Sequence, residues 1–130
     1  MNGNELFVFL ESKGFHLVDS KNSSSFGDYY YILTNNIFSL RFVKDKSIIS
    51  IDIQSALKNN ESWYDLALIK NLLYNDIQLD IAMTSEQYCE FLKNEIDNIT
   101  ILFNSDDYFC VKKRIDNLKE KRIKQMFSWL

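Results

Sequence analysis

Few side chains in this sequence belong to the types that carry out catalysis. The only histidine, His16, stands at the start of a predicted strand, where we expect a half-buried structural side chain. The two cysteines, Cys89 and Cys110, have neither metal-ligand spacing nor a disulfide framework, so we expect buried thiols in a reducing compartment. No clustered metal ligands and no glycine-rich phosphate-binding motif occur. The sequence therefore predicts a protein that is not an enzyme and that uses no metal or cofactor.

The charged side chains are distributed unevenly along the chain. The formal net charge is −3, but residues 1–110 hold eight basic and sixteen acidic residues. Within residues 75–110 there are eight carboxylates and a single basic residue, Lys93. An acidic field of this kind repels nucleic acid and attracts basic proteins. We therefore predict that a basic protein partner contacts four of these carboxylates, Asp76, Asp80, Glu86 and Glu90; the alternative is that they form only a solvated helix face.

The segment "VKKRIDNLKEKRIK", residues 111–124, is the exception, with seven basic and two acidic residues. A basic helix of this kind can lie along nucleic-acid phosphates. However, Asp116 and Glu120 are spaced three or four residues from lysines, which is typical of a solvated helix face. The acidic remainder of the chain also opposes nucleic-acid binding, so a DNA-binding antitoxin-type regulator stays an alternative only.

A second candidate contact comes from the three strands predicted within residues 29–53. Two-residue turns at Asn35-Asn36 and at Asp45-Lys46 both place the same apolar side chains on one face. That inward face holds Tyr29, Tyr31, Leu33, Phe38, Leu40, Phe42, Ile49, Ile51 and Ile53. The outward face holds Tyr30, Ile32, Ser39, Arg41, Val43, Ile48, Ser50 and Asp52.

In this register Tyr30 lies opposite Arg41, which permits a cation–π contact, and Asp52 lies diagonal to Arg41. Tyrosine and arginine are enriched at the energetic centres of protein interfaces. We therefore predict partner binding by Tyr30, Arg41 and Asp52, unless the first or the last helix covers this face.

The rest of the chain reads as one further strand and four helices around this meander. We expect a helix over residues 4–13, a strand over 15–20 and a polar loop over 21–28. Ser62 and Asp65 are predicted to cap a helix that includes Trp63, and Thr84 and Gln87 form a capping box that opens the next helix. Ser105 is expected to cap the last helix, which runs to about Ser128 with Met126 inward. The fold class is α+β: one domain over residues 1–130, with an N-terminal helix, a four-stranded antiparallel sheet and three C-terminal helices on one of its faces.

No apolar run approaches the roughly 20 residues that a membrane helix requires. The N-terminal residues also lack the basic start of a secretory signal. We therefore expect a cytoplasmic protein with no membrane partner.

A resemblance adds to this reading. The succession of "GFHLVDS", "FGDYYYIL", "FSLRFVKDK", an isoleucine-rich strand and "WYDLALIKNLL" resembles the small bacterial immunity proteins of polymorphic and contact-dependent growth-inhibition toxin systems. The resemblance covers size, order of elements and acidic character, and it carries over no individual site residue. It implies a non-enzymatic protein that binds one cognate toxin domain, often a nuclease, and blocks its active or substrate-binding site. A phage or mobile-element accessory protein, which would also act by binding, is the other alternative.

Overall fold

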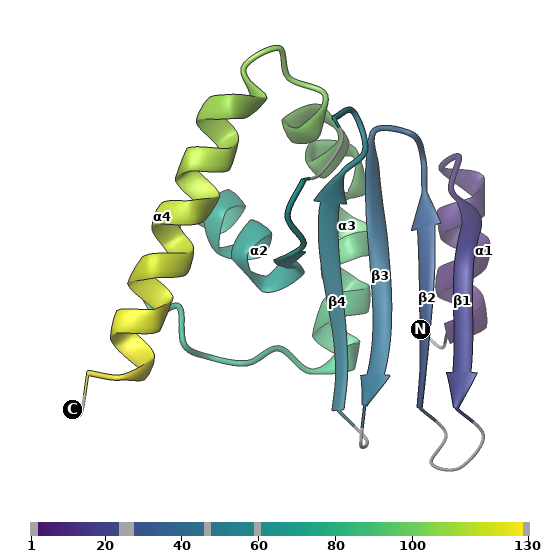
Figure 1. Ribbon diagram of the computed structural model, residues 1–130, viewed down its shortest axis with the longest axis horizontal. Coiled ribbons are helices and arrows are strands. Elements are labelled where there is room, and N and C mark those ends of the chain that lie inside the picture. The colour runs from purple at the N-terminus through teal and green to yellow at the C-terminus, as the bar shows by residue number, and fades with distance from the viewer. Residues whose placement is uncertain (1–2, 24–27, 46–47, 59–60, 129–130) are drawn as a thin grey trace.

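The computed structural model describes residues 3–23, 28–45, 48–58 and 61–128. In this part of the chain, five antiparallel strands form one sheet in the order β1-β2-β3-β4-β5, and four helices accompany it (Figure 1). The elements are α1 (Gly3–Ser12), β1 (His16–Ser23), β2 (Asp28–Thr34), β3 (Phe38–Asp45), β4 (Ile48–Ser55), β5 (Tyr64–Asp65), α2 (Leu66–Tyr74), α3 (Ser85–Phe103) and α4 (Tyr108–Met126). The α+β class and the antiparallel meander are confirmed, whereas the expected number of strands was one too few. The predicted loop over residues 21–28 was also wrong at both ends, which belong to β1 and β2.

The pairing of the meander differs from the predicted register, although its faces do not. Leu33 pairs with Leu40 rather than Phe38, and Phe42 pairs with Ile51 rather than Ile49. In the first hairpin the Asn35 side chain accepts hydrogen bonds from the backbone N–H groups of Ile37 and Phe38, at 3.0 and 2.9 Å. The turn is therefore centred on Asn36-Ile37, with Asn36 at a φ of 70°, one residue later than predicted.

Moving the centre of a hairpin by one residue changes every pairing partner by two. Since side chains alternate with a period of two, each residue keeps its face. The second hairpin is displaced in the same way, because Asp45 belongs to β3 and pairs with Ile48. The predicted turn residue Lys46 lies outside the described residues.

The connection from β4 to α2 departs furthest from expectation. The predicted helix does not include Trp63, because Tyr64 and Asp65 form β5 and α2 begins only at Leu66. Asp65, and not Ser62, is the N-cap, and its Oδ1 accepts from the Ala67 N–H at 2.9 Å. An extended backbone at residues 64–65 continues the sheet and leaves Trp63 outside the helical layer.

The two long helices begin and end close to their predicted positions. Thr84 and Gln87 form the expected capping box at the start of α3. Ser105 accepts from the Asp107 N–H at 3.1 Å and so closes the turn between the helices, while Asp107 occupies the N-cap of α4 without a side-chain cap. Met126 is 49% exposed, so the prediction that it faces inward was wrong.

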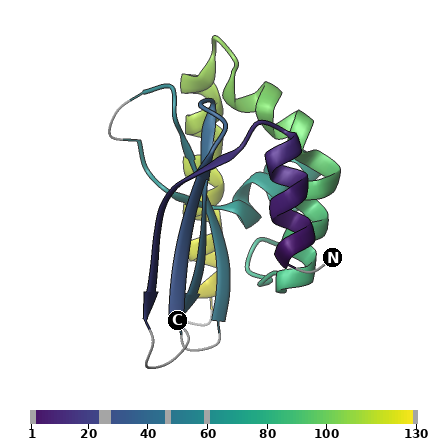
Figure 2. The same ribbon diagram turned by 90° about the vertical axis from the view of Figure 1, so that its right-hand side faces the viewer.

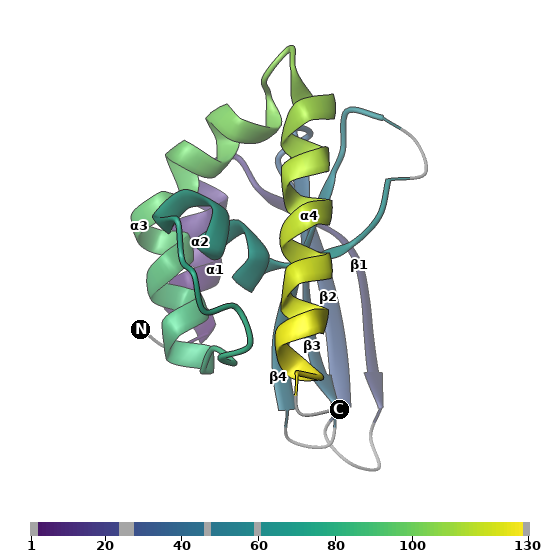
Figure 3. The same cartoon turned by 90° about the vertical axis from the view of Figure 1, so that its left-hand side faces the viewer.

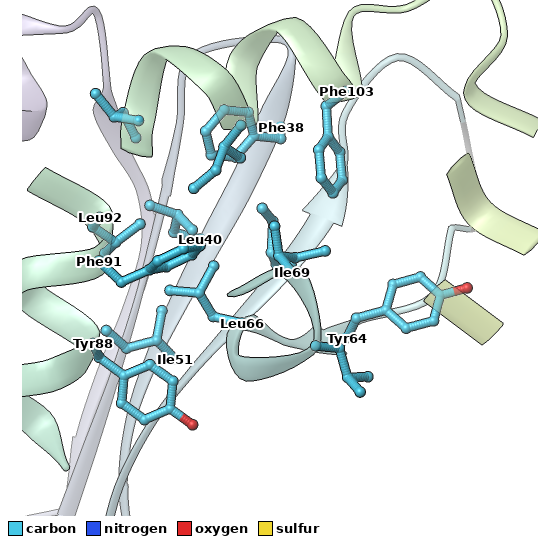
Figure 4. Packing of buried hydrophobic residues seen from close by; sticks show 14 of the residues in the cluster. Phe38, Leu40, Ile51, Tyr64, Leu66, Ile69, Tyr88, Phe91, Leu92 and Phe103 are labelled. Carbon is cyan, nitrogen blue, oxygen red and sulfur yellow. The ribbon is translucent and has the colours of Figure 1, made fainter. Parts of the chain in front are cut away.

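The core lies between the inward face of the meander and the helices. Phe38, Leu40 and Ile51 meet Leu66 and Ile69 of α2 and Leu92 and Phe103 of α3 in one buried cluster (Figure 4). Phe7 of α1 packs edge-on against Tyr31 and Phe42, so α1 covers this same face. Figure 2 shows α1 and α3 together on one side of the sheet.

The last helix occupies a different position from the one predicted. It stands beside α2, past the β4–β5 border of the sheet, rather than on the sheet face (Figures 1 and 3). The Tyr64 hydroxyl donates to Asp116 at 2.7 Å and Arg122 binds Asp65 at 3.0 Å, which fixes α4 to β5. Of the described helices, none covers the outward face, since α1 lies on the inward side and α4 lies past the border.

Candidate functional site

The outward face of the meander contains a shallow hollow of about 610 Å³. We call it the sheet-face hollow. It contains the three sheet residues predicted to bind a partner, together with residues of β1 and of both hairpin ends. The lining residues are Asp19, Lys21, Asp28, Tyr29, Tyr30, Ile32, Arg41, Val43, Lys44, Asp45, Ser50 and Asp52.

Arg41 lines this hollow and is held by two contacts. It pairs directly across the strands with Asp52, and its Nη2 lies 2.8 Å from the Asp52 Oδ2. Its guanidinium also lies 4.5 Å from the centre of the Trp63 ring. A guanidinium fixed on two sides loses little side-chain entropy when a partner contacts its remaining donors.

Two predicted contacts of Arg41 were wrong in detail. Ile32, not Tyr30, lies opposite Arg41, and the cation–π partner is Trp63, not Tyr30. Asp52 is directly opposite Arg41 rather than diagonal to it, which brings the two charges closer than expected. The changed pairings follow from the one-residue displacement of the turns, whereas the Trp63 contact follows from the extended backbone at β5.

Tyr30 is a hydrogen-bonded surface residue of the same hollow. Its hydroxyl donates to the Asp19 Oδ2 at 3.0 Å, and this hydrogen bond raises the pKa of Tyr30 above its ordinary value. At neutral pH Tyr30 is therefore an uncharged amphipathic ring that can contact another protein. It faces the hollow beside Val43, its partner across the strands.

The segment that follows β4 lies beside the outward face, next to Arg41. The Gln54 side chain donates to the Glu61 carbonyl oxygen at 2.6 Å, which holds residues 61–63 beside the outward face. Lys112 of α4 binds Glu61 at 2.9 Å and so connects this segment to the last helix. The Trp63 contact was missed in the sequence, although Asp65 before the unbroken apolar run Leu66–Ile69 indicates a helix start after Trp63.

The four predicted acidic contacts lie away from the sheet-face hollow, on the helical side of the molecule. Asp76 is already paired with Lys70 at 2.8 Å. Asp80, Glu86 and Glu90 are exposed, and no ion pair joins them to another described residue. Asp76 and Glu90 both line a second hollow of about 390 Å³ between α2, α3 and their connection. The sequence thus pointed to two surfaces, which the fold places on opposite sides of the sheet.

The basic segment on α4 is partly occupied by internal ion pairs. Lys112 binds Glu61 and Arg122 binds Asp65, while Lys113 lies 4.7 Å from the centre of the Phe109 ring. Two of its cations therefore hold the helix to β5 and its flanking segment.

His16, Cys89 and Cys110, the side chains first considered for catalysis, line neither hollow. Burial raises the pKa of the Cys89 thiol, and a hydrogen bond to Asp107 raises that of Cys110, which makes both thiols poorer nucleophiles. Cys110 is exposed, contrary to expectation. Within residues 3–23, 28–45, 48–58 and 61–128, no group of three or more histidine, cysteine, aspartate or glutamate side chains has metal-site geometry. None of the helices in that part of the chain is both long and apolar enough to span a bilayer.

The chain has no match among the known proteins with which it was compared: no protein-family model, curated protein or solved structure matches it. The sheet-face hollow and the exposed carboxylates are therefore interpreted from their own geometry and charge.

Proposed function

We propose that this chain is a non-enzymatic immunity protein that binds a cognate bacterial toxin domain, a nuclease, in the cytoplasm and covers its active or substrate-binding site. The observation that carries the proposal is the outward sheet face, which none of the described helices covers (Figure 2) and which displays tyrosine, arginine and branched apolar side chains around the sheet-face hollow. These residue types are the ones that dominate binding energy at protein interfaces.

The form of the hollow supports a protein rather than a small molecule as its ligand. It is broad and shallow, and the side chains around it come from four neighbouring strands. Small-molecule sites are concave and enclose most of their ligand, whereas this surface presents anchors to a convex partner. Arg41, stacked on Trp63 and bridged to Asp52, is such an anchor.

The charge of the chain supports a basic partner. A nuclease carries a basic cleft for phosphates, and the acidic residues 1–110 would accelerate its approach through long-range attraction. In this proposal Asp80, Glu86 and Glu90 act on the association rate, while Tyr30 and Arg41 act on the lifetime of the complex.

The decisive experiment uses the toxin domain that this proposal expects a neighbouring gene to encode. We would purify that domain with this chain and measure association and dissociation rates for the unaltered protein, Tyr30→Ala and Arg41→Ala. Each substitution should weaken binding about thirtyfold, mainly by faster dissociation, because it removes a central anchor. Phe109→Ala is the matched control, since Phe109 is an exposed ring beside a lysine on α4, outside the sheet-face hollow.

A second set of variants separates the two surfaces. Glu86→Lys with Glu90→Lys should slow association at low salt and leave dissociation unchanged. If these reversals instead accelerate dissociation while Tyr30→Ala and Arg41→Ala have no effect, the helical side is the contact. Absence of any complex with the neighbouring toxin domain would contradict the proposed function.

A further inference from the structure

The two edge strands of the sheet differ in length and in the elements beside them. At one border β5 is only two residues long and is followed directly by α2, with α4 beside it (Figure 1). At the other border β1 has eight residues and pairs, in the described part of the chain, with β2 alone. Its outer backbone N–H and C=O groups can therefore pair with another strand.

The helical layer also stops short of β1. Leu17 pairs with Leu33 of the inward face, yet it is 55% exposed, and Ser20 and Asn22 on the same face of β1 are exposed as well. The helix α1 instead reaches Tyr31 and Phe42 of the next two strands. The inward side chains of β1 are therefore exposed at this border rather than packed under a helix.

The sequence of β1 restricts how two copies could pair. A two-fold axis perpendicular to the sheet makes the two β1 strands antiparallel. It also keeps the inward faces of both copies on one side, so each side chain of β1 lies opposite a side chain of the same face in the second copy. In a register centred on Asp19 or on Lys21, that side chain would lie opposite the same side chain of the second copy, so that like charges would meet. The intermediate register, centred on Ser20, places Asp19 opposite Lys21 of the second copy, and this pair occurs twice.

We propose that the β1 edge joins two copies of this chain into an antiparallel dimer centred on Ser20 and held by two Asp19–Lys21 pairs. A lysine on an edge strand commonly prevents pairing, but in this register its charge is compensated. The irregularity between Leu17 and Asp19 limits regular pairing to a short stretch, so the dimer dissociates readily on dilution.

This arrangement extends the binding surface beyond one copy. Asp19 and Lys21 line the sheet-face hollow at its β1 side. The dimer would therefore place two such hollows next to each other on one continuous sheet face, whatever ligand they bind.

Sedimentation velocity across micromolar to millimolar concentrations tests the proposal without any toxin. The unaltered chain should pass from monomer to dimer, and Asp19→Lys or Lys21→Asp alone should weaken the dimer at least about tenfold through like-charge contacts. The double variant Asp19→Lys/Lys21→Asp should restore it. An equimolar mixture of the two single variants should also form a dimer, since each unlike pair is then rebuilt, and this rescue shows that both variants are folded.

Asp80→Lys serves as the control for a general charge effect, because Asp80 lies on the connection between α2 and α3. A chain that stays monomeric at every concentration overturns the proposal. So does a dimer that the single reversals leave intact. Protection of β1 amides from hydrogen exchange only when the toxin domain is added would assign this edge to a strand of the toxin instead.

Discussion

The two faces of the meander are built from the same three strands but are organised in different ways. On the inward face, Leu33, Phe38, Leu40, Phe42, Ile51 and Ile53 are buried against helices that are distant in the sequence. On the outward face, Arg41 has its ion-pair partner on the next strand and its aromatic partner in the segment just after β4. The inward face therefore depends on many apolar neighbours, whereas the outward face depends on a few directional contacts.

This difference would let one sheet serve both stability and the binding that we propose. Removing apolar surface from water stabilises the fold roughly in proportion to the area buried. Polar contacts at a partly exposed face add little net stability but fix the orientation of side chains. Substitutions on the outward face should therefore alter binding with little cost in folding.

The strongest test of this contrast is Phe38→Ala. Phe38 is fully buried between Phe15 and Phe103, so its removal leaves a cavity and should lower the free energy of unfolding by about 3–5 kcal/mol. Val43→Ala, on the outward face, should cost less than about 1 kcal/mol. Urea denaturation measures both, and comparable losses at the two positions would remove the distinction between the faces.

Alkaline pH should destabilise the helical side selectively. Burial raises the pKa of Tyr64, Tyr88 and Tyr108, the last to about 12, above the ordinary value of 10.0 that applies in the unfolded chain. Stability from these groups is complete below pH 10 and is lost as the pH rises through the folded pKa, because the unfolded chain releases its protons first.

The expected loss is about 1 kcal/mol per tyrosine for each pH unit between 10.0 and the raised pKa of the folded state. Tyr108→Phe should reduce the loss in urea denaturation at alkaline pH and cost almost nothing at neutral pH, because its buried hydroxyl forms no hydrogen bond to another described residue. Tyr30→Phe is the comparison: the pKa of Tyr30 is raised by its hydrogen bond to Asp19 rather than mainly by burial, so this substitution at the surface should reduce the loss less than Tyr108→Phe.

The smallest effect should come from the ion pair of the outward face. A double-mutant cycle of Arg41→Ala and Asp52→Ala should give a coupling energy of about 1 kcal/mol, since both side chains are partly exposed. The coupling should decrease with added salt. A value of several kcal/mol would mean that this pair belongs to the stabilising core.

The parts of the fold that were predictable are those set by local sequence. Alternation assigned Leu40 and Arg41 to opposite faces, and the Thr84–Gln87 capping box marked the start of α3. The pairing partners were not predictable, because the Asn35 side chain displaces the turn through two backbone hydrogen bonds. The predicted faces were still correct because each pairing partner changed by two positions, which is an even number.

The candidate site was predictable in its residues but not in its contacts. Tyr30, Arg41 and Asp52 do lie together, since they share a face of adjacent strands. Asp19 reaches the same hollow from β1, and Trp63 reaches Arg41 from the residue before β5; the positions of both strands depend on pairings across the whole sheet. Asp76 and Glu90 were grouped with other carboxylates by sequence proximity alone, and that grouping could not show that they face the other side.

One carboxylate described above has a consequence for the order of folding. Asp65 accepts from the Ala67 N–H within α2, from the Tyr88 hydroxyl of α3 and from Arg122 of α4. The first of these bonds is local and forms with the helix itself, whereas the other two require helices that follow much later in the chain. Asp65→Asn, which keeps an acceptor for α2, should therefore leave the folding rate nearly unchanged and accelerate unfolding, so that this side chain determines how long the native state lasts.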